Sequence, residues 1–216
     1  MQATSTTDTF QEQDINYDVE RLRKWLVNEK CCNDILPYQE ELVSGFADLC
    51  EFQQSLVETR AEKDELAIVR NLKEMELERI RYLLKEYLRT RLRKIENALF
   101  YLWRDKERWS WLSAAEAEYA KQLYPLITTH FERSFLGKLP EKLRALDERD
   151  GDHHSPGNLD DLDEFVFLYA TKEMGNVTTD PSSPVTSTIF IQKGEVVCLR
   201  YSVAKHYLLD ESACLL

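Results

Sequence analysis

The hydrophobic residues between about Asp64 and Arg104 repeat with the period of a helix. This stretch contains neither Gly nor Pro, and the helix-favouring residues Glu, Lys and Arg fill most of the intervening positions. The positions of one face follow at mostly three- and four-residue steps: Leu66, Val69, Leu72, Ile80, Leu84, Tyr87, Leu88, Arg91, Ile95 and Leu99. The pattern predicts one long amphipathic helix, which at about 1.5 Å per residue would measure roughly 60 Å.

A rod of this length needs more than one neighbour. Several apolar residues fall off the main stripe and widen the apolar face: Leu77, Leu83, Leu92, Leu102 and Trp103. We therefore expect one side of the helix to pack within its own chain and another to be available to a different chain.

Two shorter helical patterns precede the long helix. The first runs from about Asp18, a plausible N-cap, to Asn28 and has the apolar stripe Val19, Leu22, Trp25 and Leu26. Pro37 marks a break, and the second runs from about Tyr38 to Arg60. The apolar side of the second carries Leu42, Val43, Phe46, Leu49, Cys50, Phe52 and Leu56. A bend or tight turn is expected in the charged stretch Arg60–Glu65.

Ser113 followed by Glu116 is a capping box, which predicts another helix from about Ala114 to Leu136 with a kink at Pro125. Before it, Trp103, Trp109 and Trp111 are interleaved with basic residues. This cluster fits the capping layer of a helical bundle, which we favour, although such residues can also form a platform on which nucleic-acid bases stack.

The period changes in the last part of the chain. Phe165–Leu168, Thr186–Ile191 and Val196–Tyr201 are short runs typical of strands, with turn residues at Gly175-Asn176, Pro181–Pro184 and Lys193-Gly194. They predict a small antiparallel β module. The apolar end of the chain, Leu215 and Leu216 included, is expected to be packed rather than solvated.

The expected fold class is mainly α with a small C-terminal β module, hence α+β overall. The expected divisions are a flexible tail at 1–14, a helical domain at 15–148 dominated by one long helix, a linker at 149–161 and a β-rich domain at 162–216. The linker is expected because RDGDHHSPGNLDD is rich in Gly, Pro, Ser and acid.

Charge argues against a dedicated nucleic-acid binder, because the chain of 216 residues has a net charge of -11. The long helix differs from the rest: twelve Lys or Arg stand against seven Asp or Glu between Arg70 and Arg108. The helix is therefore a basic rod in an acidic protein.

Candidate chemistry is sparse. The five cysteines have no CxxC spacing, which favours free thiols in a reducing compartment. A nucleophile elbow, a phosphate loop, an HExxH motif and a dinucleotide fingerprint are all missing. His153 and His154 fit a polar loop better than a metal site. We expect no enzyme, no catalytic, cofactor-binding or metal residue, and no membrane span.

The run from Met75 to Asn97, MELERIRYLLKEYLRTRLRKIEN, resembles without gaps the signature helix of the Sld-five subunit, also called subunit four, of the GINS complex. Two shorter matches flank it in the family's order. One is Trp25 with Asn28, Glu29 and Lys30, and the other is LDEFVFL from Leu162 to Leu168.

This resemblance implies a non-catalytic subunit of a heterotetramer with a helical domain first and a β domain second. Three Psf subunits would be its obligate partners. The assembled complex would join the MCM ring and the Cdc-forty-five protein in the replicative DNA helicase, which serves initiation and fork progression. The resemblance further implies a nuclear protein without cofactor, contact with the replicative polymerase machinery, and mostly indirect contact with DNA.

The resemblance also implies a set of motif and candidate interface residues. They are Trp25, Asn28, Glu29, Met75, Glu78, Arg79, Arg81, Tyr82, Tyr87, Arg89, Arg91, Arg93, Lys94, Glu96, Phe165, Val166, Phe167, Leu168, Leu215 and Leu216. We expect some to hold the helical domain together and others to pair with a neighbouring subunit.

The arginines of this set have a physical reason to be arginine. A guanidinium can bind a carboxylate through two parallel hydrogen bonds, which an ammonium cannot do. Arg79, Arg89, Arg91 and Arg93 are therefore expected to hold partner carboxylates at a partly buried interface, and Arg89→Ala to weaken assembly. Two alternatives stay open: a DNA-binding protein that uses the basic helix and the tryptophans, and an autonomous helical adaptor of another family.

Overall fold

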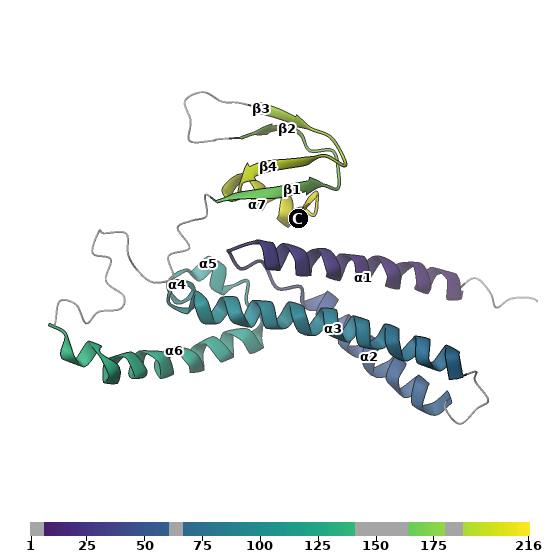
Figure 1. Ribbon diagram of the computed structural model, residues 1–216, viewed down its shortest axis with the longest axis horizontal. Coiled ribbons are helices and arrows are strands. Elements are labelled where there is room, and N and C mark those ends of the chain that lie inside the picture. The colour runs from purple at the N-terminus through teal and green to yellow at the C-terminus, as the bar shows by residue number, and fades with distance from the viewer. Residues whose placement is uncertain (1–6, 61–66, 141–163, 180–187) are drawn as a thin grey trace, which may run out of the picture.

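The structure, a computed structural model, describes residues 7–60, 67–140, 164–179 and 188–216. Long helices form most of it, and a small β module lies against the first of them (Figure 1). The expected fold class is confirmed. The linker expected at 149–161 and most of the turn expected at Arg60–Glu65 lie outside the described residues.

Three helices form the centre of the helical part: α1 (Thr7–Cys31), α2 (Glu40–Arg60) and α3 (Ala67–Asn97). α3 packs on both α1 and α2. Most of the predicted apolar stripes of α1 and α2 are buried, namely Val19, Leu22, Trp25, Leu26, Leu42, Val43, Phe46 and Cys50. Hydrophobic periodicity therefore located these two faces correctly.

α1 begins at Thr7, well before Asp18, where its first turn was expected. The expectation of a flexible tail over residues 1–14 is therefore wrong from Thr7 onward. No Gly or Pro interrupts the chain between Thr7 and Asp18. Adding a residue to an existing helix needs no new nucleus, so the packed part of α1 extends towards the N-terminus even through polar residues.

The long helix bends at Ala98 instead of running straight to Arg104. α3 ends at Asn97, and α4 (Leu99–Arg104) follows directly. The Ala98 amide donates to the Lys94 carbonyl at 2.8 Å, and the Leu102 amide donates to the Ala98 carbonyl at 2.9 Å. Helical hydrogen bonds thus continue through the bend, and the prediction of one long helix is wrong only in its straightness.

The capping box is confirmed. The Glu116 amide donates to Ser113 Oγ at 3.2 Å, and the Ser113 amide donates to Glu116 Oε2 at 2.9 Å. These bonds start α6 (Ala114–Ser134), which continues through Pro125. The short helix α5 (Lys106–Trp109) precedes it, and the 3-10 turn η1 (Leu136–Lys138) follows it.

The described part of the β module contains two antiparallel sheets. In the larger one, β1 (Phe165–Ala170) lies between β4 (Val196–Arg200) and β5 (Ala213–Leu215). The smaller one pairs β2 (Gly175–Thr178) with β3 (Thr188–Ile191). Helix α7 (Tyr201–Leu209) connects β4 to β5 and packs on the larger sheet.

Two details of this module differ from expectation. Gly175-Asn176, expected as a turn, opens β2. Tyr201, expected at the end of a strand, is instead the buried first residue of α7. The turn at Lys193-Gly194 is confirmed, and Gly194 has a φ of 90°, which glycine adopts without steric cost.

The helical part and the β module share one hydrophobic core. Leu22 and Trp25 of α1, Tyr87 of α3, and Leu168 and Leu215 of the sheet belong to one cluster of buried residues. A second cluster lies where α3 and α4 meet α6. We keep the division at 15–148 and 162–216 as a proposal, but expect the two parts to unfold together.

Among the described helices, none has the length and hydrophobicity of a membrane span.

Candidate functional site

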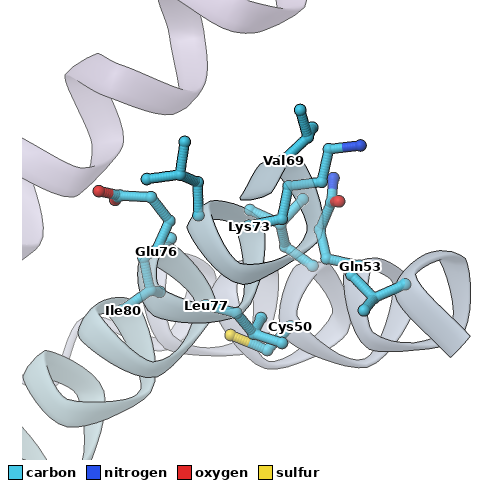
Figure 2. A pocket seen from close by; sticks show the side chains of 10 residues that line it. Cys50, Gln53, Val69, Lys73, Glu76, Leu77 and Ile80 are labelled. Carbon is cyan, nitrogen blue, oxygen red and sulfur yellow. The ribbon is translucent and has the colours of Figure 1, made fainter. Parts of the chain in front are cut away.

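An apolar groove lies between the C-terminal half of α2 and the N-terminal half of α3 (Figure 2). It holds a cavity of about 320 Å³. Most of its lining is aliphatic or sulfur-bearing: Leu49, Cys50, Val57, Val69, Leu72, Leu77 and Ile80. Three polar side chains, Gln53, Lys73 and Glu76, complete the lining. The site is therefore shaped for an apolar side chain or helix face rather than for a polar substrate.

The surface around this groove is unusually apolar for a solvated helix pair. Leu72 is 60% exposed and Met75 is 68% exposed, and Phe52, Ile68 and Tyr82 are also exposed. Leu72 and Phe52, which the sequence places on apolar faces, therefore lie at the surface of this chain. Periodicity finds an apolar face but cannot say which molecule covers it. Exposed apolar side chains grouped on two packed helices are typical of an interaction site.

Short-range ion pairs organise the polar side of α3 near the groove. Arg79 Nη2 lies 2.9 Å from Glu76 Oε2, and Arg81 Nη1 lies 3.1 Å from Glu78 Oε1. Both pairs join residues three apart on the exposed helix surface. Burial raises the pKa of the Cys50 thiol, so that it stays neutral in the groove wall.

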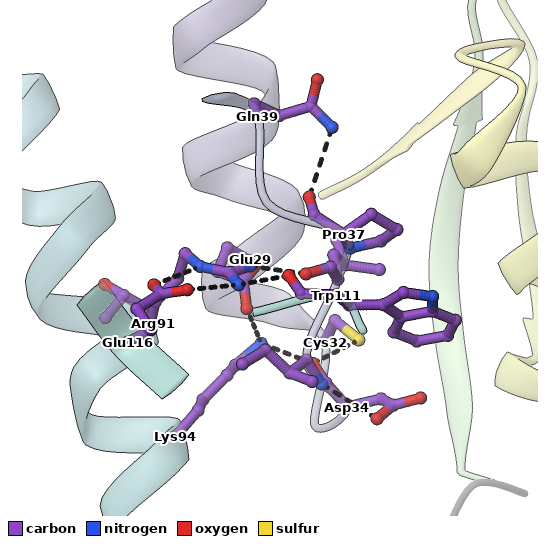
Figure 3. A network of polar contacts seen from close by, with 12 residues as sticks. Glu29, Cys32, Asp34, Pro37, Gln39, Arg91, Lys94, Trp111 and Glu116 are labelled. Carbon is purple, nitrogen blue, oxygen red and sulfur yellow. Dashed lines mark hydrogen bonds and ion pairs between the residues drawn. The ribbon is translucent and has the colours of Figure 1, made fainter. Parts of the chain in front are cut away.

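Arg91 lies at the centre of a buried polar network (Figure 3). Its Nε donates to Glu116 Oε1 at 2.8 Å, and its Nη2 donates to Glu116 Oε2 at 3.0 Å. Nη1 donates to the Leu36 carbonyl and lies 3.3 Å from Glu29 Oε2. Nη2 also donates to the Trp111 carbonyl. One side chain thereby joins α3 to α1, to α6 and to the segments that precede α2 and α6.

Charge compensation keeps this arginine ionised. Burial acts to lower the pKa of Arg91, but the hydrogen bonds that Arg91 donates to Glu116 and the charge of Glu29 outweigh it, and the pKa is raised. Burial has the opposite effect on Tyr87, whose ring lies against the guanidinium, and raises the pKa of its phenol. Arg91 therefore stays a cation and Tyr87 a neutral phenol near neutral pH.

The network continues towards the C-terminal module. Lys94 Nζ donates to Glu29 Oε1 at 2.9 Å, and Arg108 Nε donates to Asp34 Oδ1 at 2.7 Å. Lys205 of α7 lies 3.5 Å from the other oxygen of Asp34. Because Asp34 is fully buried, these cations supply the compensation that a buried carboxylate requires.

The motif arginines therefore divide into two groups. Arg91 is enclosed within the chain, so the expectation that it pairs with a partner subunit is wrong. Arg79, Arg89 and Arg93 are exposed, and Arg89 lies only 3.6 Å from Glu86 of its own helix. The sequence pattern could not separate the two groups, because the burial of an arginine on α3 depends on where α1 and α6 pack in the fold.

Other motif residues also fall into buried and exposed positions. Trp25, Asn28, Glu29, Tyr87, Leu168 and Leu215 are buried, and Lys94 and Val166 are partly buried. Met75, Glu78, Tyr82, Glu96, Phe165, Phe167 and Leu216 are exposed, and Arg81 is partly exposed. Asn28 Oδ1 accepts a hydrogen bond from the Leu215 amide at 2.8 Å. Leu215 is therefore packed against α1 as expected, whereas the expectation that Leu216 is packed is wrong, because its side chain is exposed.

The tryptophan cluster lies beside α6. Trp103 stacks on Tyr124 with ring centroids 4.4 Å apart, and Trp109 meets Trp103 edge-on at 5.4 Å. Trp109 and Trp111 pack against the second core cluster. This arrangement agrees with the favoured interpretation of a capping layer, although Trp103 remains 43% exposed.

Within the described ranges, no group of three or more His, Cys, Asp or Glu side chains is placed to hold a metal ion. His153 and His154 lie outside these ranges.

Sequence reasoning missed Asp34 and Arg108 as network members. It found Glu116 only as a capping residue, and the N3 carboxylate of a capping box was the one signal that could have led to the Arg91 pair.

Comparison with known proteins gives two family matches. Residues 51–135 match the family described as the GINS complex protein helical bundle domain. Residues 160–216 match the family described as the DNA replication complex GINS protein SLD5 C-terminus. The matches follow the same order as the helical and β parts of this chain.

Curated relatives are similar over most of the chain. DNA replication complex GINS protein sld5 of Schizosaccharomyces pombe is 30% identical over 197 residues, which cover 90% of each chain. The SLD5 protein of Arabidopsis thaliana is 30% identical over 195 residues, covering 87% of this chain and 86% of the relative. The SLD5 protein of Homo sapiens is 28% identical over 190 residues, covering 85% and 82%.

Proposed function

The chain belongs to the SLD5 family of GINS complex subunits, with a role in DNA replication, and we propose that it acts there as a non-catalytic scaffold whose α2–α3 groove is covered by a partner subunit. The single observation that carries this proposal is the groove, with Leu72 and Met75 exposed beside it. Apolar side chains of this size favour burial, and a partner helix would remove them from water.

The division of the arginines supports the same proposal. The charged groups of the Arg91 network are paired with one another within the chain. The network is therefore suited to holding the helices in one arrangement. Arg79, Arg89 and Arg93 keep guanidinium groups at the surface of α3, where a partner carboxylate can reach them. Rigid internal charges and exposed external charges suit a subunit that presents a preformed surface.

Three Psf subunits are the proposed partners, and Met75, Glu78, Arg79, Arg81, Tyr82, Arg89, Arg93 and Glu96 are the proposed interface residues on α3. Through the complete complex the chain would join the MCM ring and the Cdc-forty-five protein in the replicative helicase. A nuclear location, contact with the replicative polymerase machinery and mostly indirect contact with DNA belong to this proposal. Membership of the family and the net charge of -11 support it.

A second candidate function, direct DNA binding, rests on one observation. Trp103, Lys106, Trp109 and Lys121 line a hollow of about 300 Å³, which combines aromatic rings with positive charge. However, Tyr124 already stacks on one face of Trp103. We therefore favour the scaffold, and a salt series of DNA binding by the full chain would identify this second function.

The direct test is the solution mass of the full chain, alone and after co-expression with three Psf subunits. The proposal predicts a discrete complex with one copy of each subunit. The variant Leu72→Glu/Met75→Glu should reduce that complex, while the variant Leu126→Glu on exposed α6 should not. A chain that remains a monomer beside all three partners would contradict the proposal.

A further inference from the structure

A second pocket lies where α1 meets the β module, away from the α2–α3 groove. Its cavity is about 330 Å³. α1 provides one wall, and the segments that follow β1, precede β4 and connect α7 to β5 provide the others. We call it the junction pocket, because residues from both parts of the chain form it.

Three lysines from three different segments line the junction pocket: Lys24 of α1, Lys172 after β1 and Lys193 before β4. All three are exposed, and within the described ranges none of them forms an ion pair. Two acids also line the pocket. Glu211 is already paired with Arg21, and Glu20 lies 4.0 Å from Arg23. The pocket therefore has surplus positive charge in a protein whose net charge is -11.

One corner of the junction pocket is held in a fixed shape. Arg21 Nε and Nη2 both donate to Glu211 Oε1, at 3.0 and 2.7 Å. Glu211 has a φ of 51°, a left-handed conformation that costs a non-glycine residue about 1 kcal/mol. The Thr171 hydroxyl donates to the Glu211 carbonyl at 3.1 Å. The pocket is therefore largely preformed, as ligand sites usually are.

We propose that the junction pocket binds an acidic peptide segment of another protein, whose Asp or Glu side chains meet Lys24, Lys172 and Lys193. Ammonium groups spread over three segments suit carboxylates spaced along a peptide. The exposed ring of Tyr17 at the rim offers contact for one apolar side chain of that peptide.

A phosphate group fits the junction pocket less well. Specific phosphate sites commonly use a guanidinium fork or converging backbone amides. Here Glu211 occupies the fork of Arg21, and the amides of Thr171 and Lys172 both donate to the Ser212 carbonyl. A carboxylate-rich peptide is therefore the ligand class that these residues favour.

The test measures fluorescence anisotropy of a labelled peptide, rich in Asp and Glu with one central Leu, on titration with the full-length chain. The variant Lys24→Gln/Lys172→Gln/Lys193→Gln should weaken binding by about tenfold, since three exposed ion pairs are lost. A matched variant, Lys85→Gln/Lys121→Gln/Lys138→Gln, removes the same charge from exposed positions elsewhere and should bind like the unchanged chain.

Further probes separate the ligand classes. The same peptide with Asn and Gln in place of its acids should bind at least about tenfold more weakly if charge recognition carries the affinity. Equal weakening by both lysine variants would show a non-specific charge effect and overturn the proposal. Tighter, Lys24-dependent binding of a phosphoserine peptide or of single-stranded DNA would overturn the choice of ligand. Absence of any peptide binding would overturn the site.

Discussion

The guanidinium of Arg91 and the carboxylate of Glu116 form a two-point ion pair that the protein encloses almost completely. This relationship gives one residue of the signature helix a role in folding rather than in assembly. Burying two charges is costly, and the loss of one partner leaves the other uncompensated. The arginines of α3 should therefore respond very differently to the same substitution.

Arg91→Ala should destabilise the chain by about 3–5 kcal/mol, because it leaves Glu29 and Glu116 buried without their shared cation. Arg89→Ala should change the free energy of unfolding by less than about 1 kcal/mol, since Arg89 is largely exposed. Urea unfolding followed by circular dichroism measures both. Equal effects of the two substitutions would show that the buried network does not stabilise the fold.

Arg89→Ala should still reduce the amount of partner subunit that co-purifies with the chain. Its guanidinium is free to leave the 3.6 Å contact with Glu86 for a better placed carboxylate on a partner. Affinity purification from co-expressing cells measures this. An undiminished tetramer would remove Arg89 from the proposed interface without affecting the groove.

Replacement of Glu211 should separate backbone strain from its ion pair. Glu211→Ala loses the pair with Arg21 and keeps the left-handed backbone, so it should destabilise the chain. Glu211→Gly loses the same pair but removes the strain, and should be more stable than the Ala variant by about 1 kcal/mol. Thermal unfolding of both variants measures the difference. An Ala variant at least as stable as the Gly variant would contradict this explanation.

The stability of the chain should fall as the pH rises above about 9. Burial raises the pKa of the Cys32 thiol from its ordinary value of 9.0 to about 11. Between these values the unfolded thiol loses its proton and the folded one keeps it, so that ionisation favours the unfolded state. Unfolding in urea from about pH 8 to about pH 10 measures this loss. Cys32→Ala should reduce the slope, and an unchanged slope would assign the loss to other groups such as Tyr87 and Tyr201, whose pKa values burial also raises.

Much of the helical part followed from the sequence, because its signals are local. The capping box at Ser113 and Glu116 needed only residues three apart, and the stripe of α1 needed only helical spacing. The early start of α1 at Thr7 and the bend at Ala98 were missed. Where α1 begins and where the long helix bends both depend on tertiary packing and on helical hydrogen bonds that continue beyond the residues with the clearest apolar pattern.

The site was harder to predict because burial depends on distant segments. Arg91 and Arg89 are equally basic and lie two positions apart, yet only Arg91 faces Glu29 and Glu116. Asp34 is fully buried although it is a charged residue in the short loop between α1 and α2, because Arg108 and Lys205 come to it from much later in the chain. No spacing rule connects residues that far apart.

The most direct test of the groove as the assembly surface is hydroxyl-radical footprinting of Met75. Its side chain is 68% exposed in the chain and lies on the apolar face beside the groove. Oxidation of Met75 should fall strongly when the chain is assembled with its partners, while oxidation of Tyr119 on α6, which lies away from the groove, should change little. Equal oxidation of Met75 in the free and assembled chain would contradict the claim that a partner covers the α2–α3 groove.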